Sequence, residues 1–155
     1  MKNLVDLHAH ILPGLDDGPK SLADSLRMLE AFEEMGFGHV FATPHHRLYS
    51  WKGIEPDIVE KGVRDLTLAA GEKGIGVNLL PGMEFDFDEI MPERLSTILG
   101  KGDHLLVDVG FLGVPQDLAG LLGKFMDMGA KIFLVHPERN QKLCRLRKEL
   151  MKACS

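Results

Sequence analysis

Cysteine is scarce in this chain of 155 residues, which contains only Cys144 and Cys154, both near the C-terminus. Two cysteines at one end do not make the framework of a disulfide-rich secreted domain. The N-terminus reads Met1-Lys2-Asn3-Leu4 and lacks the apolar stretch and the cleavage site of a secretory signal. We therefore expect a protein of the reducing cytoplasm.

Long hydrophobic runs and an excess of positive charge are also missing. No apolar run approaches the roughly 20 residues that a membrane-spanning helix requires. The 18 Lys and Arg residues are outnumbered by 23 Asp and Glu, so the formal net charge is −5. Proteins that bind nucleic acid usually carry a basic surface. We expect neither a membrane span nor a nucleic-acid partner.

The rest of the composition is typical of a globular protein, with 45% hydrophobic and 26% charged residues. Apolar segments that read as buried strands alternate with segments that have helical periodicity. The predicted strands cover residues 2–7, 38–43, 77–80, 104–109 and 131–135. The predicted helices cover residues 21–35, 55–71, 92–99, 115–128 and 141–152. Continuous apolar strands separated by helices predict an α/β fold with a parallel sheet.

Local signals mark the ends of the first two helices. Ser21 is a predicted N-cap, with Asp24 three residues later, and Gly36 is a predicted helix stop. Pro56 opens the next helix, which ends around residues 71–74. The apolar positions predicted to face the core are Leu22, Leu26 and Leu29 in the first helix and Ile58, Val59, Val63 and Leu66 in the second.

Two histidines stand at the end of the first predicted strand, in the run Asp6-Leu7-His8-Ala9-His10. Alternate side chains of a strand share a face, so His8 and His10 should point the same way, with Asp6 beneath them. Two imidazoles and a nearby carboxylate suit a borderline metal such as zinc or manganese. The alternative is that the histidines simply lie in a polar loop.

The other predicted strands are also followed or ended by candidate ligands, which are His45 and His46, Glu84, Asp108 and His136. In parallel α/β folds, polar chemistry collects at the carboxyl ends of the strands. Each of these side chains alone has a structural or solvated explanation. Because all of them fall at the same predicted edge, we expect a metal site there.

Several other polar residues are given structural roles or left open. His39 and His104 stand at strand beginnings and are expected to be structural. Asp16 is expected to cap its loop, and Glu138 to be solvated. His46 is either close to the ligands or exposed, and Tyr49 and Trp51 either line a substrate site or lie on a loop surface.

Four motifs stand out along the chain, which are Asp6-Leu7-His8-Ala9-His10-Ile11-Leu12-Pro13-Gly14-Leu15-Asp16-Asp17-Gly18, Ala42-Thr43-Pro44-His45-His46, Leu80-Pro81-Gly82-Met83-Glu84 and His136-Pro137-Glu138-Arg139. They resemble those of the PHP superfamily, and within it the bacterial capsule-type (CpsB/CapC-like) tyrosine-protein phosphatases. The resemblance extends to about residue 140. It implies a distorted (β/α)7 TIM-like barrel, incomplete here with about five parallel strands, in one domain spanning residues 1–155.

The resemblance also implies up to three divalent metal ions that activate water for phosphomonoester hydrolysis. Manganese is implied first, with zinc, iron and magnesium as alternatives. By position, the ligand pairs would be His8 with His10, Asp17 with His45, and Glu84 with His136. Arg139 would contact the substrate phosphate through parallel guanidinium donors.

The implied substrate is a phosphotyrosine protein, such as a capsule-type tyrosine kinase, in the regulation of capsule or exopolysaccharide synthesis. A thiol-based phosphatase is excluded, because Cys144 is followed six residues later by Leu150 where that chemistry needs Arg. Two alternatives remain open. One is a non-catalytic relative that serves as a binding or regulatory module, and the other is a different PHP activity, such as hydrolysis of histidinol phosphate.

The chain departs from the family pattern in two places. Asp108 stands where these phosphatases place a bridging glutamate, and its shorter side chain would bridge metals only after a shift or through a water. No Asp-x-His follows residue 137, where the family has a Ser-Asp-Ala-His-like motif. We therefore expect exposed edges on the first and fifth strands, which a homo-oligomer could cover. We also expect weakened metal binding and weak or no activity in an isolated monomer.

Overall fold

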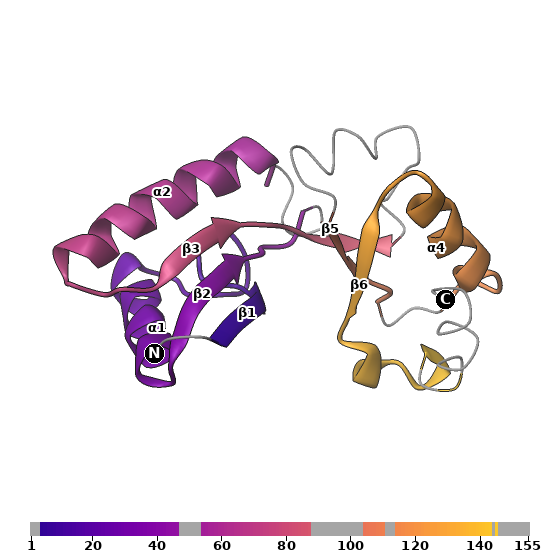
Figure 1. Ribbon diagram of the computed structural model, residues 1–155, viewed down its shortest axis with the longest axis horizontal. Coiled ribbons are helices and arrows are strands. Elements are labelled where there is room, and N and C mark those ends of the chain that lie inside the picture. The colour runs from indigo at the N-terminus through magenta and orange to yellow at the C-terminus, as the bar shows by residue number, and fades with distance from the viewer. Residues whose placement is uncertain (1–3, 47–53, 88–103, 111–113, 144, 146–155) are drawn as a thin grey trace. The chain divides into compact units, whose positions relative to one another are not determined.

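The computed structural model describes residues 4–46, 54–87, 104–110, 114–143 and 145, in two compact units, residues 1–84 and 85–155. Its elements, in chain order, are β1 Leu4–Ala9, α1 Leu22–Glu34, β2 Phe37–Ala42, α2 Pro56–Glu72, β3 Asn78–Pro81, β4 Glu84–Asp86, β5 His104–Asp108, α4 Leu118–Asp127, β6 Lys131–Val135 and the 3-10 turn η3 Pro137–Arg139 (Figure 1). The predicted helix at 92–99, most of that at 141–152, Tyr49, Trp51 and both cysteines lie outside the described residues.

The first unit is a β-α-β-α-β arrangement. Its sheet has the order β1-β2-β3, and both strand pairs are parallel. Helices α1 and α2 contact each other, and they pack against β2 and β3 respectively (Figure 1). Parallel pairing brings the carboxyl ends of the three strands to one edge, with Ala9 opposite Ala42 and Ala42 opposite Pro81. That edge is where the predicted ligands follow.

The predicted helix boundaries of the first unit are confirmed. Ser21 caps α1, and its hydroxyl accepts a hydrogen bond from the Asp24 backbone N–H. Pro56 opens α2. Gly36 and Gly74 follow the two helices with φ of 90° and 75°, a left-handed conformation that favours glycine.

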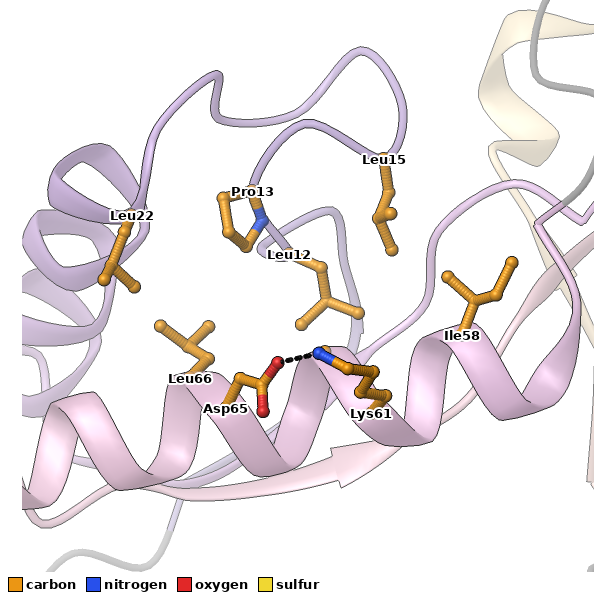
Figure 2. A pocket seen from close by; sticks show the side chains of 9 residues that line it. Leu12, Pro13, Leu15, Leu22, Ile58, Lys61, Asp65 and Leu66 are labelled. Atoms are coloured by element: carbon orange, nitrogen blue, oxygen red, sulfur yellow. Dashed lines mark hydrogen bonds and ion pairs between the residues drawn. The ribbon is translucent and has the colours of Figure 1, made fainter.

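The predicted core of these helices is partly wrong. Leu26, Leu29, Val59, Val63 and Leu66 are buried as expected. Leu22 and Ile58, however, are 46% and 39% exposed. Both lie in the first turn of their helix, where they border a pocket of about 230 Å³ between α2 and the loop that contains Leu12, Pro13 and Leu15 (Figure 2). Helical spacing places a residue on the inner face but does not say how far along the helix the covering elements extend.

The second unit contains β5 and β6, which pair in parallel from His104 opposite Lys131 to Asp108 opposite Val135. Their sheet has the order β4-β5-β6. Helix α4 contacts β6 and is capped by Asp117, whose carboxylate accepts a hydrogen bond from the Gly120 backbone N–H. The helix predicted at 115–128 is observed only over Leu118–Asp127, so it is shorter at both ends. The short strand β4 was not predicted, because a strand of three residues is too short to show an alternating pattern.

The α/β class with parallel strands is confirmed, whereas a single domain across residues 1–155 stays a prediction. β1 and β6 are edge strands of their sheets among the described residues, as expected for the first and fifth predicted strands. In that part of the chain, every helix is too short or too polar to cross a bilayer.

Helix α2 offers a test of backbone stability at Gly71. A Cβ built there meets no atom within 4 Å, so we expect Gly71→Ala to raise the free energy of unfolding by about 0.5–1 kcal/mol. Gly74→Ala is the matched contrast, because φ of +75° disfavours a side chain, and it should lower stability by about 1 kcal/mol. Urea unfolding monitored by circular dichroism measures both. Equal effects of the two variants would contradict the backbone explanation.

Candidate metal centre

Glu84 lies at the centre of a histidine cluster and is 1% exposed. Its carboxylate Oε2 is 3.1 Å from His10 Nε2 and 3.1 Å from His45 Nδ1, and its Oε1 is 3.6 Å from His8 Nε2. The backbone also holds Glu84 in place, because its N–H donates to the Pro44 carbonyl and its carbonyl accepts from the His46 N–H. A buried carboxylate therefore faces imidazole nitrogens from residues far apart in sequence.

The strand ends of the first unit assemble this cluster. His8 lies in β1 and His10 just beyond it, and their ring centroids are 5.1 Å apart. His45 follows β2, and its ring centroid is 4.7 Å from that of His10. Glu84 begins β4, and only Gly82 and Met83 separate it from the end of β3. The prediction that His8 and His10 converge is confirmed, and parallel pairing brings His45 and Glu84 to them.

A second group of candidate ligands, His10, Asp17 and His45, shares His10 with the group of His8, His10 and Glu84. Asp17 Oδ1 is 3.4 Å from His10 Nδ1 and 3.8 Å from His45 Nε2, and the Asp17 side chain is 66% exposed. One potential ligand atom from each residue lies within 4.8 Å of the others in the sets His8/His10/Glu84 and His10/Asp17/His45. Imidazole nitrogens mixed with carboxylate oxygens are the donors that manganese and zinc accept. The residues present therefore fit divalent metal ions.

The predicted site residues of the second unit also stand at strand ends. Asp108 is the last residue of β5, and its Oδ1 accepts a hydrogen bond from the Gly110 N–H at 2.8 Å. His136 follows β6 with φ of 50°, a left-handed conformation that costs a non-glycine residue about 1 kcal/mol. Arg139 ends the 3-10 turn and is exposed. A part for Asp108, His136 and Arg139 in the centre stays a prediction.

Comparison with known proteins decides the family. Residues 4–153 match the family model described as capsular polysaccharide synthesis, CpsB/CapC. The chain belongs to the CpsB/CapC family. The resemblance read from its motifs is thereby confirmed.

Two relatives of this CpsB/CapC chain carry names that state an activity. Tyrosine-protein phosphatase YwqE of Bacillus subtilis is 30% identical over 144 residues, which cover 90% of this chain and 56% of YwqE. Tyrosine-protein phosphatase CpsB of Streptococcus agalactiae serotype III is 26% identical over 144 residues, covering 90% of this chain and 59% of that protein. The chain thus spans little more than half the length of these relatives.

A solved structure agrees with the fold of the CpsB/CapC chain. It comes from crystal structures of YwqE from Bacillus subtilis and CpsB from Streptococcus pneumoniae, described as unique metal-dependent tyrosine phosphatases. The TM-score is 0.88 at 29% identity, over 97% of this chain and 63% of the solved chain. The α/β fold with parallel strands is therefore shared with that solved structure.

Without metal, the centre of this CpsB/CapC chain holds its charge as ion pairs. Burial alone would raise the pKa of Glu84, but hydrogen bonds from His10 and His45 hold that pKa well below its ordinary value. Burial alone would lower the pKa of His10, but hydrogen bonds to Asp16 and Glu84 raise it to about 10. Burial also opposes the charge on His45, and Glu84 outweighs it, so the pKa of His45 is raised. Protons therefore occupy donor atoms that a divalent cation would otherwise use.

The remaining polar residues resolve the alternatives left by the sequence. His46 is buried, and its Nε2 lies 3.7 Å from Glu55 Oε2, so it is not a surface residue. His39 is exposed at the start of β2, and the Glu138 side chain is 71% exposed. Asp16 does cap its loop, through the Gly18 N–H, yet it is also buried against His10. Asp16 is buried and Asp17 is exposed, and nothing in the sequence around these adjacent residues predicts this difference.

Two further residues that contact candidate site residues or their turns were missed by the sequence reasoning. Thr43 is fully buried, and its hydroxyl is 2.7 Å from His8 Nδ1. In the second unit, Asn140 Nδ2 donates to the Gly110 carbonyl and so ties the turn that carries Arg139 to the end of β5. Only the position of Thr43 within the motif Ala42-Thr43-Pro44-His45-His46 could have indicated it.

Proposed function

We propose that this chain is a metal-dependent phosphatase that hydrolyses phosphotyrosine in proteins. The observation that carries the proposal is the buried Glu84 carboxylate facing His8, His10 and His45 at the carboxyl edge of the sheet. The CpsB/CapC family model and the two relatives named as tyrosine-protein phosphatases support the same reaction. The proposed chemistry relies on imidazole and carboxylate groups that could hold metal ions, and not on a nucleophilic side chain.

The residues of the first unit would hold the metal ions in two overlapping groups. His8, His10 and Glu84 form one group, and Asp17 and His45, with His10 between them, form the other. Divalent ions bound there would lower the pKa of water and offset the negative charge of a phosphate. Because Glu84 is buried, solvent screens its carboxylate little, and its attraction to bound cations would be strong.

The second unit would add phosphate recognition. Arg139 is exposed at the end of the 3-10 turn, and its guanidinium can donate two parallel hydrogen bonds to phosphate oxygens. From the family resemblance we propose His136 as a further metal ligand and Asp108 as a bridging carboxylate. Gly110 already donates to one Asp108 oxygen, which leaves the other for this role.

The wider setting of the proposed reaction follows from the family. The CpsB/CapC model is described by capsular polysaccharide synthesis, so a phosphorylated capsule-type tyrosine kinase is the proposed substrate in the cytoplasm. We propose that the strands belong to a PHP-type TIM-like barrel within one domain. A homo-oligomer would cover the edges of β1, which exposes Leu4, Val5 and Leu7, and of β6. Manganese is the proposed metal.

Hydrolysis of an aryl phosphate with and without manganese tests the function. We expect manganese to raise turnover by at least about 10-fold and His8→Ala to remove that increase, because one imidazole ligand is lost. His39→Ala is the matched control, since His39 is exposed in the first half of β2, and it should behave like the unmodified chain. A phosphotyrosine peptide should be hydrolysed in preference to a phosphoserine peptide of the same sequence.

One feature favours a binding module as the second candidate. Asp108 stands where the family pattern has glutamate. Tight manganese binding without turnover of any aryl phosphate or of histidinol phosphate would favour that role over the phosphatase. Turnover of histidinol phosphate alone would instead indicate a different PHP activity.

A further inference from the structure

Two buried side chains outside the proposed ligand set contact the histidines on the ring side away from Glu84. Asp16 is 2% exposed, and its Oδ2 is 2.6 Å from His10 Nδ1. Thr43 is fully buried, and its Oγ1 is 2.7 Å from His8 Nδ1. In both rings, therefore, Nδ1 contacts a side-chain oxygen atom while Nε2 faces the Glu84 carboxylate.

We propose that Asp16 and Thr43 are positioning residues that determine which ring nitrogen His10 and His8 present to the metal centre. The proposal rests on the metal centre of the proposed function and adds to it the groups that orient its ligands. A neutral imidazole has one N–H and one lone pair. When Nδ1 donates its hydrogen to Asp16 or Thr43, the lone pair is on Nε2 and points toward Glu84.

Asp16 is held by three groups besides His10. The Gly18 N–H donates to Asp16 Oδ1 at 3.0 Å, the His45 N–H donates to Oδ2 at 3.3 Å, and the Lys20 ammonium donates to the Asp16 carbonyl at 2.8 Å. A Cβ at Gly18 would lie 2.7 Å from the His10 carbonyl oxygen, so only glycine permits this close approach. Asp16 thus fixes the His10 ring and joins its loop to the segment that carries His45.

Thr43 is held by its backbone and by its methyl group. The Thr43 N–H donates to the Ala9 carbonyl at 2.9 Å. A Cβ at Gly82 would lie 2.8 Å from Thr43 Cγ2, so the absence of a side chain at Gly82 makes room for the methyl group. With its methyl group packed there, Thr43 directs its hydroxyl to His8. The two glycines in the metal-site motifs therefore serve the positioning residues.

The simpler explanation is that Asp16 and Thr43 only stabilise the loop and the strand end. A structural role would change the melting temperature of a variant but not the metal affinity of its folded form or the ring nitrogen that binds the metal. Substitution of a group that orients a metal ligand typically lowers metal affinity by about 10–100-fold. Metal affinity and ring-nitrogen identity therefore separate the two roles.

Three near-isosteric substitutions test the proposal in the full chain. Thr43→Val removes the acceptor for His8 Nδ1, whereas Thr43→Ser keeps the hydroxyl. In Asp16→Asn, an amide N–H₂ replaces one of the oxygens that accept from the Gly18 and His10 N–H groups, so both bonds cannot persist. Calorimetric titration with zinc measures the affinity. Long-range ¹H–¹⁵N spectra of the zinc-loaded chain, which is diamagnetic, identify the protonated nitrogen of each histidine.

We expect Thr43→Val to weaken zinc binding about 10-fold and Asp16→Asn about 10–100-fold, with Thr43→Ser within about 3-fold of the unmodified chain. In the unmodified chain, His8 and His10 should both carry hydrogen on Nδ1 and zinc on Nε2. Zinc on Nδ1 of either ring would overturn the proposal, even if Asp16→Asn does not fold. Unchanged affinity and ring signals in folded Thr43→Val and Asp16→Asn would also overturn it, while the proposed function would stand. Absence of zinc and manganese binding in the unmodified chain would instead overturn the metal centre itself.

Discussion

Replacing Glu84 by glutamine is expected to weaken manganese binding by at least about 100-fold and to abolish manganese-dependent turnover. Glu84 is the one carboxylate that faces His8, His10 and His45 among the described residues. The neutral amide keeps the shape of the side chain but removes its charge and turns one oxygen into a hydrogen-bond donor. The amide N–H₂ would donate hydrogen bonds to the imidazole nitrogens, whose lone pairs a metal ion needs.

Titration of the metal-free chain with manganese, followed by elemental analysis of the loaded protein, measures the effect of Glu84→Gln. Glu60→Gln is the matched control, because Glu60 lies on the surface of α2 with its side chain 57% exposed and pairs only weakly with Arg64. It should bind manganese as the unmodified chain does. Manganese affinity of Glu84→Gln within a few-fold of the control would contradict a centre built around Glu84.

The pH dependence of thermal stability is expected to reverse when metal is added. Without metal, the pKa of His10 is raised from 6.5 to about 10, so its ion pairs stabilise the fold fully below about pH 6.5. That stabilisation is lost as the pH rises toward 10. The pKa of Glu84 is lowered from 4.5, so its contribution is complete above that value and is lost as the pH falls. The metal-free centre should therefore stabilise the fold most between pH 4.5 and pH 6.5.

With metal, the same proton on His10 becomes a competitor. Each unit of pH below the raised pKa weakens binding up to about 10-fold if one proton is displaced, so affinity should rise up to about 100-fold from about pH 6 to about pH 8. A 100-fold gain in affinity corresponds to about 2.7 kcal/mol, or a rise in melting temperature of about 5–10 °C for a chain of this size.

Thermal melts at these two pH values, with chelator or with excess manganese, measure the reversal. The metal-free chain should melt lower at about pH 8 than at about pH 6, and manganese should stabilise it more at the higher pH. His39→Ala should reproduce both trends, since its side chain is exposed and outside the centre. A manganese-induced shift of equal size at both pH values would contradict displacement of a proton from His10.

Local structure was well predicted wherever a short-range signal acts. Ser21, Pro56, Gly36 and Gly74 mark helix boundaries because capping and backbone conformation depend on neighbouring residues only. The apolar runs likewise identified β2, β3, β5 and β6 within one or two residues. The predicted parallel α/β class followed from their alternation with helices and is confirmed.

Features that depend on distant residues were not predicted. β4 has only three residues, and its first residue bridges to His45, about 40 positions earlier. Leu22 and Ile58 have the spacing of core residues but remain partly exposed at the starts of their helices. Such outcomes depend on where another element ends in space.

The sequence by itself determined the donor chemistry and its place at the strand ends. It supplied His8 and His10 two positions apart, and His45 and Glu84 after later strands. Only the tertiary structure decided that Glu84 is enclosed by these imidazoles, since parallel pairing of β1, β2 and β3 sets which strand ends meet. It alone also decided that Asp16 and Thr43 contact the rings, because a hydrogen bond forms only when two atoms lie within about 3 Å, and spacing along a chain does not specify such distances.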